Sequence, residues 1–391
     1  MAIVKSLRSS RLFRLAPLAL AAACLGGNAL AASSVNTVPG MPPVVNPANM
    51  YSESGLGHLS PVVKNDPARI YVPNLRSNDV YVIDPATYKV VDKFKVGEGP
   101  QHVVPSWDLR TLWVTNNAER KKTGSLTPID AATGKPGTAV PVDDPYNMYF
   151  TPDGKEAIVV AEAFARLDFR DAHSMKEHSS LSAPECKGIN HADFAIDGSY
   201  AIFTCEFTGK LVKIDMVNRK VLGYLDLSKK GMPQDIRASP DGKTFYVADM
   251  MADGVYLIDG ASFKQVGFIK TGVGTHGLYP SRDGSKLYVA NRGSNKVHGP
   301  RGGKGSVSVI DFASQKEVAN WPIPGGGSPD MGNISIDGKQ LWLSGRYDNS
   351  VYVIDTTNGN VKSIPVKTEP HGLTVWPQPG RYSLGHTGNL R

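Results

Sequence analysis

Four of the nine histidines in this chain stand at matching places in a series of short apolar segments. They are His102, His191, His276 and His371, and each stands at the start of one segment. Imidazole groups brought together from several segments could ligate a transition metal, act as general bases or bind a polar ligand. The first question is therefore which elements of the fold would bring them together.

Other polar residues occupy equivalent places. Asn147, Asp235 and Asp330 open further segments, and polar residues also follow the next segment of each series. The candidate ligand-binding residues are therefore His102, Asn147, His191, Glu206, Asp235, Asp249, His276, Arg292, Asp330, Arg346 and His371. A wet channel also needs a polar lining, so a purely structural role is an equally open interpretation of the same pattern.

The equivalent positions can be recognised because each repeat contains an alternating apolar segment that ends in aspartate. This aspartate occurs seven times, as Asp84, Asp130, Asp171, Asp215, Asp259, Asp311 and Asp355. Successive aspartates lie 46, 41, 44, 44, 52 and 44 residues apart. A regular period of this length, filled with short strands, is typical of a β-propeller, in which each repeat makes one four-stranded sheet. The sequence therefore predicts an all-β fold, a seven-bladed β-propeller with four antiparallel strands per blade.

One repeat shows how the strands would place the candidates. Residues 233–238, 244–249, 254–258 and 265–270 are predicted as strands A to D, counted from the channel outward. Strand A begins at one face of the disc and strand B returns to that face, so residues before A and after B converge on one mouth of the central channel. The longer loops that follow strand B, and should overhang the same mouth, are residues 118–124 and 293–305.

The two ends of the repeat region complement each other. The first repeat, from about residue 68, has no convincing strand A, whereas residues 370–375 form a strand A without the rest of a blade. The sequence therefore predicts that the C-terminal strand pairs with the N-terminal blade and closes the ring, which leaves no open sheet edge between first and last blades.

Several segments resemble a known repeat. Leu112–Asn116 (LWVTN), Leu287–Asn291 (LYVAN) and Ser306–Asp311 (SVSVID) are similar to the YVTN-type propeller repeat. The chain from residue 58 to 391 resembles periplasmic YncE-like propellers. The resemblance implies an exported seven-bladed propeller, but it implies no particular activity, because such propellers host many functions.

The N-terminal region is predicted to be a targeting segment followed by a leader. Within residues 1–31, four basic residues precede an apolar stretch, and Ala29-Leu30-Ala31 is a small-x-small cleavage pattern, as in a secretory signal peptide. A retained anchor, or a lipid on Cys24, is the alternative. Residues 32–57 are predicted as a flexible leader, or an arm that lies on the propeller, and residues 58–391 as the propeller. We therefore expect a periplasmic or secreted protein with no transmembrane segment after cleavage.

The charge of the mature chain argues against nucleic acid as a partner. Without the four basic residues of the signal, 39 basic residues face 36 acidic ones. The basic clusters at 120–122 and 301–304 have no interleaved aromatic residues and are interpreted as solvated loop charge. The expected partner is a small polar ligand or a periplasmic protein.

Two cysteines, Cys186 and Cys205, remain in the mature chain, 19 residues apart. An exported protein meets oxidising conditions, which favour a disulfide. A disulfide also requires Cα atoms within about 7 Å, so a pair of structural thiols stays open as the alternative.

Three functions are open at this point. The first, which we favour, is a binding scaffold without catalytic activity. The second is a hydrolase, because Thr275-His276-Gly277 and Val289–Gly293 resemble the propeller lactonase (6-phosphogluconolactonase-like) family. The resemblance implies His276 as a base, with Arg292 or Arg346 stabilising the oxyanion.

The third function is a redox or metal protein. The histidines His102, His191, His276 and His371 are the candidate metal ligands, or one of them could be the axial ligand of a haem d1-like tetrapyrrole, as in related propellers. The sequence requires no cofactor, and it contains no Cys-x-x-Cys-His, Gly-x-Ser-x-Gly or His-Glu-x-x-His motif.

Overall fold

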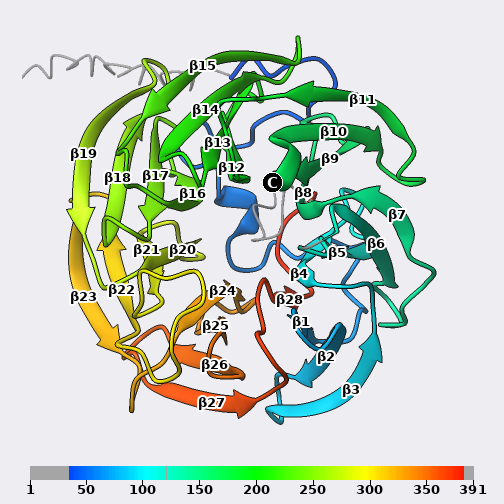
Figure 1. The fold of residues 1–391 in the computed structure, drawn as a ribbon, viewed down its shortest axis with the longest axis vertical. Coiled ribbons are helices and arrows are strands. Elements are labelled where there is room, and N and C mark those ends of the chain that lie inside the picture. Colours follow the sequence, from blue (N-terminus) through cyan, green and yellow to red (C-terminus); the bar gives the residue numbers. More distant parts are fainter. Residues whose placement is uncertain (1–34, 120, 383–391) are drawn as a thin grey trace, which may run out of the picture. The chain divides into compact units, whose positions relative to one another are not determined.

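The computed structural model describes residues 35–119 and 121–382, and these fold into a closed ring of seven four-stranded antiparallel sheets (Figure 1). The predicted all-β, seven-bladed propeller is confirmed. Short 3-10 turns at Ser52–Ser54 (η1) and Glu162–Phe164 (η2) are the helical elements of the described residues. Neither of them has the length or the apolar character that a membrane crossing requires.

The first four blades contain strands as follows, numbered along the chain. Blade 1 holds β1 (Arg69–Asn74), β2 (Asp79–Asp84), β3 (Lys89–Lys95) and, as its inner strand, β28 (Thr374–Trp376). Blade 2 holds β4 (Pro100–Pro105), β5 (Thr111–Asn116), β6 (Thr123–Asp130) and β7 (Val140–Asp143). Blade 3 holds β8 (Pro145–Phe150), β9 (Glu156–Ala161), β10 (Arg166–Asp171) and β11 (Glu177–Ser182). Blade 4 holds β12 (Ile189–Phe194), β13 (Tyr200–Cys205), β14 (Lys210–Asp215) and β15 (Lys220–Asp226).

The remaining three blades repeat the same order. Blade 5 holds β16 (Pro233–Ala238), β17 (Thr244–Asp249), β18 (Gly254–Asp259) and β19 (Lys264–Lys270), which are the four strands predicted for this repeat to within one residue. Blade 6 holds β20 (Thr275–Pro280), β21 (Lys286–Asn291), β22 (Ser306–Asp311) and β23 (Lys316–Pro322). Blade 7 holds β24 (Pro329–Ile334), β25 (Gln340–Gly345), β26 (Ser350–Asp355) and β27 (Val361–Pro365).

The hydrophobic core lies between neighbouring blades. Between blades 3 and 4, for example, Tyr149 and Phe169 pack with Phe194 and Phe203 in one buried cluster. Inner strands such as β4 and β12 are buried along their whole length, whereas the outer strand β3 is largely exposed. Because each blade covers the faces of its neighbours, the inner strands form a rigid frame around the channel.

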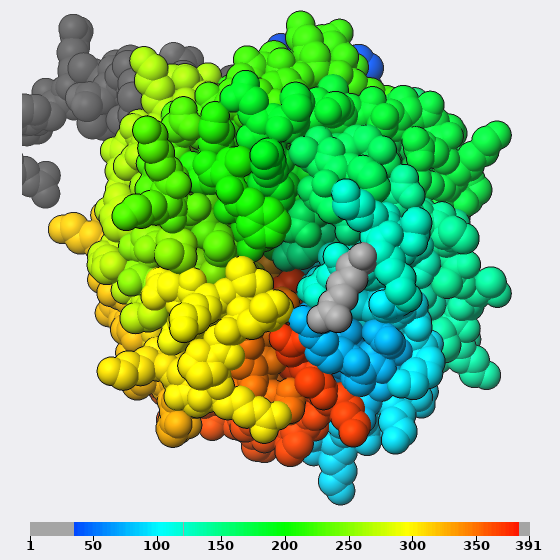
Figure 2. Space-filling view, in the orientation of Figure 1, coloured from blue at the N-terminus to red at the C-terminus, as the bar shows by residue number. Residues whose placement is uncertain are grey.

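The C-terminal strand closes the ring as predicted. β28 pairs with β1, with Ile70 opposite Val375. On its other side, the Gly372 amide donates to the carbonyl of Gln101 at 2.8 Å, which ties blade 1 to blade 2. Red C-terminal residues accordingly lie beside the blue first blade (Figure 2).

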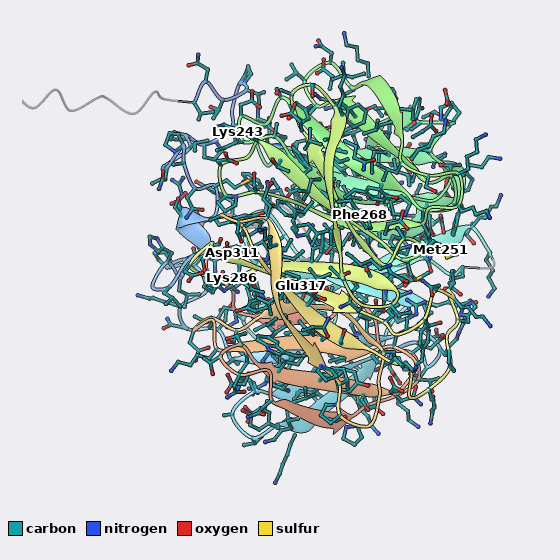
Figure 3. All side chains as sticks on the ribbon, turned by 90° about the vertical axis from the view of Figure 1, so that its left-hand side faces the viewer. Lys243, Met251, Phe268, Lys286, Asp311 and Glu317 are labelled. Atoms are coloured by element: carbon teal, nitrogen blue, oxygen red, sulfur yellow. A yellow bond between two sulfur atoms is a disulfide. The ribbon has the colours of Figure 1, made fainter. Side chains whose placement is uncertain are left out.

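The recurring aspartate is a turn residue. Asp259 accepts a hydrogen bond from the Ser262 amide at 2.7 Å, and Asp311 accepts one from the Ser314 amide at 2.8 Å. Figure 3 shows Asp311 on the same face as Lys243, opposite the turn that carries Met251. The aspartates therefore build the face away from the mouth to which the candidate residues were assigned.

Residues 35–57 run along the same face as those turns (Figure 3). The Met50 amide donates to the Pro240 carbonyl at 2.7 Å, and the Tyr51 hydroxyl donates to the Ala238 carbonyl at 2.7 Å. Both acceptors belong to the first hairpin of blade 5. The predicted signal, residues 1–31, lies outside the described residues.

A disulfide joins Cys186, which precedes β12, to Cys205, at the end of β13. The two Cα atoms are 4.7 Å apart, and both residues are buried in the cluster between blades 3 and 4. Of the two interpretations that the sequence left open, the structure thus contains the disulfide.

Candidate functional site

A cavity of about 610 Å³ opens at the predicted mouth of the channel. The hollow is visible near the centre of the face in Figure 2, beside the yellow residues around 293–305. Glu119 and Val297, from the two loops predicted to overhang this mouth, both line the cavity. Its volume is in the range of small-molecule binding sites, which is about 300–1,000 Å³.

Four of the eleven predicted residues line this cavity, and seven do not. The lining residues are Glu206, His276, Arg292 and Arg346. The residues outside the lining are His102, Asn147, His191, Asp235, Asp249, Asp330 and His371, all of which are buried. The structure therefore divides the predicted ring into a cavity wall and a layer of supporting residues.

Asp330 is the centre of the supporting layer. Its Oδ1 lies 2.8 Å from Arg292 Nε and 2.9 Å from His276 Nδ1. Its Oδ2 lies 3.5 Å from His371 Nε2 and 3.9 Å from Arg346 Nη1. Burial by itself raises the pKa of this carboxyl, but the surrounding Arg292, His276 and His371 hold the pKa of Asp330 well below its usual range. Asp330 is therefore a buried anion that orients the cavity residues above it.

The histidine rings lie close together in edge-to-face and tilted arrangements. The ring centroid of His102 lies 4.7 Å from that of His371 and 5.3 Å from those of His191 and Tyr146. Burial lowers the pKa of His102 to about 3, and burial followed by the charge of Arg292 lowers that of His276 to about 4. Burial also holds the pKa values of His191 and His371 well below the usual range. The predicted histidine cluster exists, but most of it lies in the channel beneath the cavity.

These residues fit a metal ion poorly. His276, Asp330 and His371 do bring three potential ligand atoms within 4.8 Å of one another. However, both oxygens of Asp330 already face guanidinium groups, those of Arg292 and Arg346. A bound cation would lie against these two positive charges, which opposes metal binding.

The four candidate histidines are also poorly placed to bind a tetrapyrrole. Such a cofactor needs an axial histidine that opens onto a wide cleft. Among the four candidate histidines, only His276 lines the cavity, and it is 1% exposed.

The other supporting residues make structural hydrogen bonds. Asp235 accepts from the Leu278 amide at 2.9 Å, which links blade 5 to blade 6, and it pairs with Arg237. The Asn147 side chain lies 3.2 Å from His191 Nδ1, which links blade 3 to blade 4. These contacts satisfy buried polar groups between inner strands.

Carboxyl groups form the wall on the side of blades 3 and 4. Asp144 accepts a hydrogen bond from the Ala163 amide at 2.6 Å, and burial raises the pKa of Asp144 to about 6. Burial and the neighbouring Glu206 carboxylate raise the pKa of Glu162 well above its usual range. Burial also raises the pKa of Glu206, whose Oε2 accepts from Asn190 at 2.7 Å. Glu162 and Glu206 therefore hold protons more tightly than ordinary glutamates.

Several lining residues were missed by the sequence analysis. Gln101, Tyr146 and Gln234 line the cavity, and each stands one position before a predicted candidate of the same strand. The alignment of the repeats could therefore have identified these three residues, because they occupy equivalent positions one residue before the predicted ones. The loop residues that line the cavity, such as Asp144 and Lys187, had no periodic signal.

The fold and this cavity define a class: a seven-bladed β-propeller with a polar cavity at one mouth of its channel. A model of the YNCE-like beta-propeller matches residues 27–379, so the chain belongs to that family. Antigen Lp49 of Leptospira interrogans is 24% identical over 257 residues, and the match covers 54% of this chain and 53% of Antigen Lp49. The chain therefore spans about half the length of this curated relative.

Solved structures share the fold. A proposed 6-phosphogluconolactonase from Bacteroides uniformis superposes with a TM-score of 0.62 at 17% identity, over 79% of this chain and 99% of that one. Hydrazine synthase from Kuenenia stuttgartiensis gives 0.58 at 20% identity, over 72% and 90%. The dihydro-heme d1 dehydrogenase NirN gives 0.55 at 13% identity, over 82% and 80%. At these identities the likeness concerns the fold alone.

Proposed function

We propose that this protein is an exported propeller that binds a small polar molecule in the cavity at the channel mouth. Arg346 carries the proposal. It lines the cavity, its side chain is only 6% exposed, and its closest carboxylate oxygen, on Asp330, is 3.9 Å away. Among the described residues, Arg346 Nε has no hydrogen-bond partner. A buried guanidinium with unmet donors is costly, and an acceptor group on a ligand would satisfy it.

The rest of the site supports binding because it is preformed. Asp330 fixes Arg292 and His276, and the inner strands that hold them are buried between neighbouring blades. A rigid polar site loses little conformational entropy when it binds a ligand. This arrangement suits a ligand whose polar groups match the fixed side chains.

Export is the second part of the proposal. It is supported by the signal-like residues 1–31 and by the disulfide between Cys186 and Cys205, which suits an oxidising compartment. We place the protein in the periplasm or outside the cell. Mass spectrometry of the mature N-terminus and cell fractionation test this: a cytoplasmic, full-length product would contradict it.

The binding function is tested by looking for the ligand. Small molecules released from the denatured purified protein are identified by mass spectrometry, and a metabolite library is screened by thermal shift. We expect a binder whose affinity is lost in Arg346→Met. The matched control is Arg110→Met, an exposed arginine in the first hairpin of blade 2, on the opposite face. If no ligand binds, or if both variants bind equally well, the proposal is wrong.

Lactone hydrolysis is the second candidate function. The observation that favours it is His276, a neutral cavity histidine whose Nδ1 lies 2.9 Å from Asp330 and whose neighbours are Arg292 and Arg346. An imidazole oriented by a carboxylate can act as a general base, and the arginines could stabilise an oxyanion. A panel of lactones provides the test. Turnover that disappears in His276→Gln supports this function, and no turnover by the wild type eliminates it.

A further inference from the structure

The charged groups around the mouth cavity are sorted by sign across the ring. The acids that line it come from blades 2 to 4 or the connections beside them, and the arginines come from blades 6 and 7. The acids are Glu119, Asp144, Glu162 and Glu206, and the arginines are Arg292 and Arg346. Figure 1 shows blades 3 and 4 across the channel from blades 6 and 7. The cavity therefore has an acidic wall that faces a basic wall.

We propose that the ligand of this cavity is dipolar, with an oxyanion such as a carboxylate bound by Arg346 and an ammonium group bound by Glu162 and Glu206. The inference rests on the proposed binding function and specifies its ligand class. A ligand with one charge would offer a counter-charge to one wall only, whereas an amino acid or a related zwitterion offers one to each wall.

The basic wall keeps a positive charge available. Asp330 lies beneath this wall, and its Oδ1 is taken up by Arg292 and His276. Arg346 reaches Asp330 only at 3.9 Å, and its Nε has no partner among the residues of the described chain. Asp330 is the carboxylate that lies within 4 Å of both guanidinium groups, and it contacts Arg292 much more closely than Arg346. A ligand oxyanion would therefore give Arg346 a closer acceptor.

Among the described residues that line the cavity, acids outnumber cations on the acidic wall. The carboxyls that face Glu162 are those of Glu206, Asp144 and Glu119. Of the lysines that the structure describes on this side, Lys187 lines the cavity and is exposed at the rim, and the charge of Lys122 acts on Asp144. The groups that face Glu206 are Gln234, Arg292, Asn190 and Arg346. Burial raises the pKa of both glutamates, and the Glu206 carboxylate adds to the rise at Glu162, so an ammonium group would replace a proton as their counter-charge.

An organic cation suits this wall better than a metal ion does. Among the described residues, the group of three ligand atoms within metal-binding reach is His276, Asp330 and His371, and it includes no residue of the acidic wall. The wall also presents aromatic rings, those of Tyr146 and Phe207. Aromatic faces next to carboxylates favour ammonium groups.

The test compares amino acids of increasing chain length with six-carbon compounds that carry a single charge. Binding of 4-aminobutyrate, 6-aminohexanoate and 8-aminooctanoate to the mature protein is measured by calorimetry beside hexanoate and hexylamine. We expect the best amino acid to bind at least about tenfold more tightly than either singly charged compound. Its binding should release protons, measured in buffers of different ionisation enthalpy, because the ammonium displaces a proton from the acidic wall.

Two variants test which residue binds the ammonium group of the ligand and which binds its carboxylate. Glu206→Gln should weaken binding of the amino acid by about tenfold without weakening the binding of hexanoate. Arg346→Met should weaken both. Arg110→Met should change neither, and thermal unfolding of each variant shows that it is folded.

Different failures can be told apart. If hexanoate binds as tightly as the best amino acid, or if no amino acid of the series binds, the dipolar ligand is refuted. The binding function still stands in that case if the metabolite screen yields a ligand sensitive to Arg346→Met. If neither experiment yields any ligand, the binding function itself fails.

Discussion

Arg292 and Asp330 form a buried ion pair between blades 6 and 7, with Nε 2.8 Å from Oδ1. Arg292 follows β21, and Asp330 lies near the start of β24. The pair therefore ties two neighbouring inner hairpins together at the floor of the cavity. Its position means that the charge balance of the site and the cohesion of the ring depend on the same residues.

Removing the carboxylate should strongly destabilise the protein. Asp330→Asn leaves the buried Arg292 without its counter-charge, and breaking one partner of a buried pair costs about 3–5 kcal/mol. Urea unfolding measures this loss. The control is Asp226→Asn, whose side chain is 81% exposed and which should change stability by less than about 0.5 kcal/mol. Equal unfolding free energies for the two variants would contradict the central role of Asp330.

Mild acid should destabilise the protein through its channel histidines. Burial lowers the pKa of His102 to about 3, and the pKa of His276 is lowered to about 4, against 6.5 for an ordinary histidine. Between pH 6.5 and 4, His102 and His276 are therefore protonated to a greater extent in the unfolded chain than in the folded protein. The stability from these groups is present above pH 6.5 and is lost as the pH falls from there towards 4.

At pH 5 each of these histidines should lower the unfolding free energy by up to about 2 kcal/mol relative to pH 7. Urea unfolding at both pH values measures the difference. His102→Gln should lose less stability on acidification than the wild type, whereas His173→Gln, at an exposed turn, should lose as much. A wild type with the same stability at both pH values would refute this account.

The disulfide should stabilise the blade 3 to blade 4 region. It closes a loop with a sequence separation of 19 residues, for which loop-closure entropy predicts about 3 kcal/mol. Unfolding of the wild type should therefore shift to lower urea in the presence of a reductant. The double variant Cys186→Ser with Cys205→Ser should show no effect of reductant. An unchanged wild-type midpoint would mean that the bond does not contribute.

Removal of the closing strand should destabilise the whole ring. A chain that ends at Glu369 lacks β28 and exposes the edge of β1, and an exposed strand edge promotes association. We expect a lower melting temperature and aggregation by light scattering. A chain that ends at Tyr382 is the control, because it keeps β28 and the contact between Trp376 and Asp66 at 3.0 Å. Equal melting temperatures would show that closure matters little.

Most of the fold was predictable because each repeat has the same turn-forming residues at the same positions. Aspartates such as Asp259 and Asp311 recur because each one accepts amide hydrogen bonds from the turn that follows it. Closure of the ring was predictable because the C-terminal residues 370–375 form an inner strand without a blade, and the first repeat lacks an inner strand. The disulfide was not decided by the sequence, since spacing along the chain does not give the distance between two Cα atoms.

The candidate site was predictable only in part. Arg292 and Arg346 were found because they follow the second strands of their blades directly. Gln101 and Tyr146 were missed because the pairing register shifts at the start of the inner strands, between Pro100 and His102 and between Pro145 and Asn147. Such irregularities change the direction in which side chains point. The alternation of apolar and polar residues along a strand does not show where these irregularities occur.

The pairing of β1 with β28 also has a consequence for the order of events during biosynthesis. Arg69 is paired with Trp376, so more than three hundred residues separate the two partners along the chain. The first blade to leave the ribosome is thus the last one that can be completed, whatever the intervening blades have done. Contacts between such distant residues form slowly. We therefore expect blade 1 to keep an unpaired edge until residues 374–376 have left the ribosome.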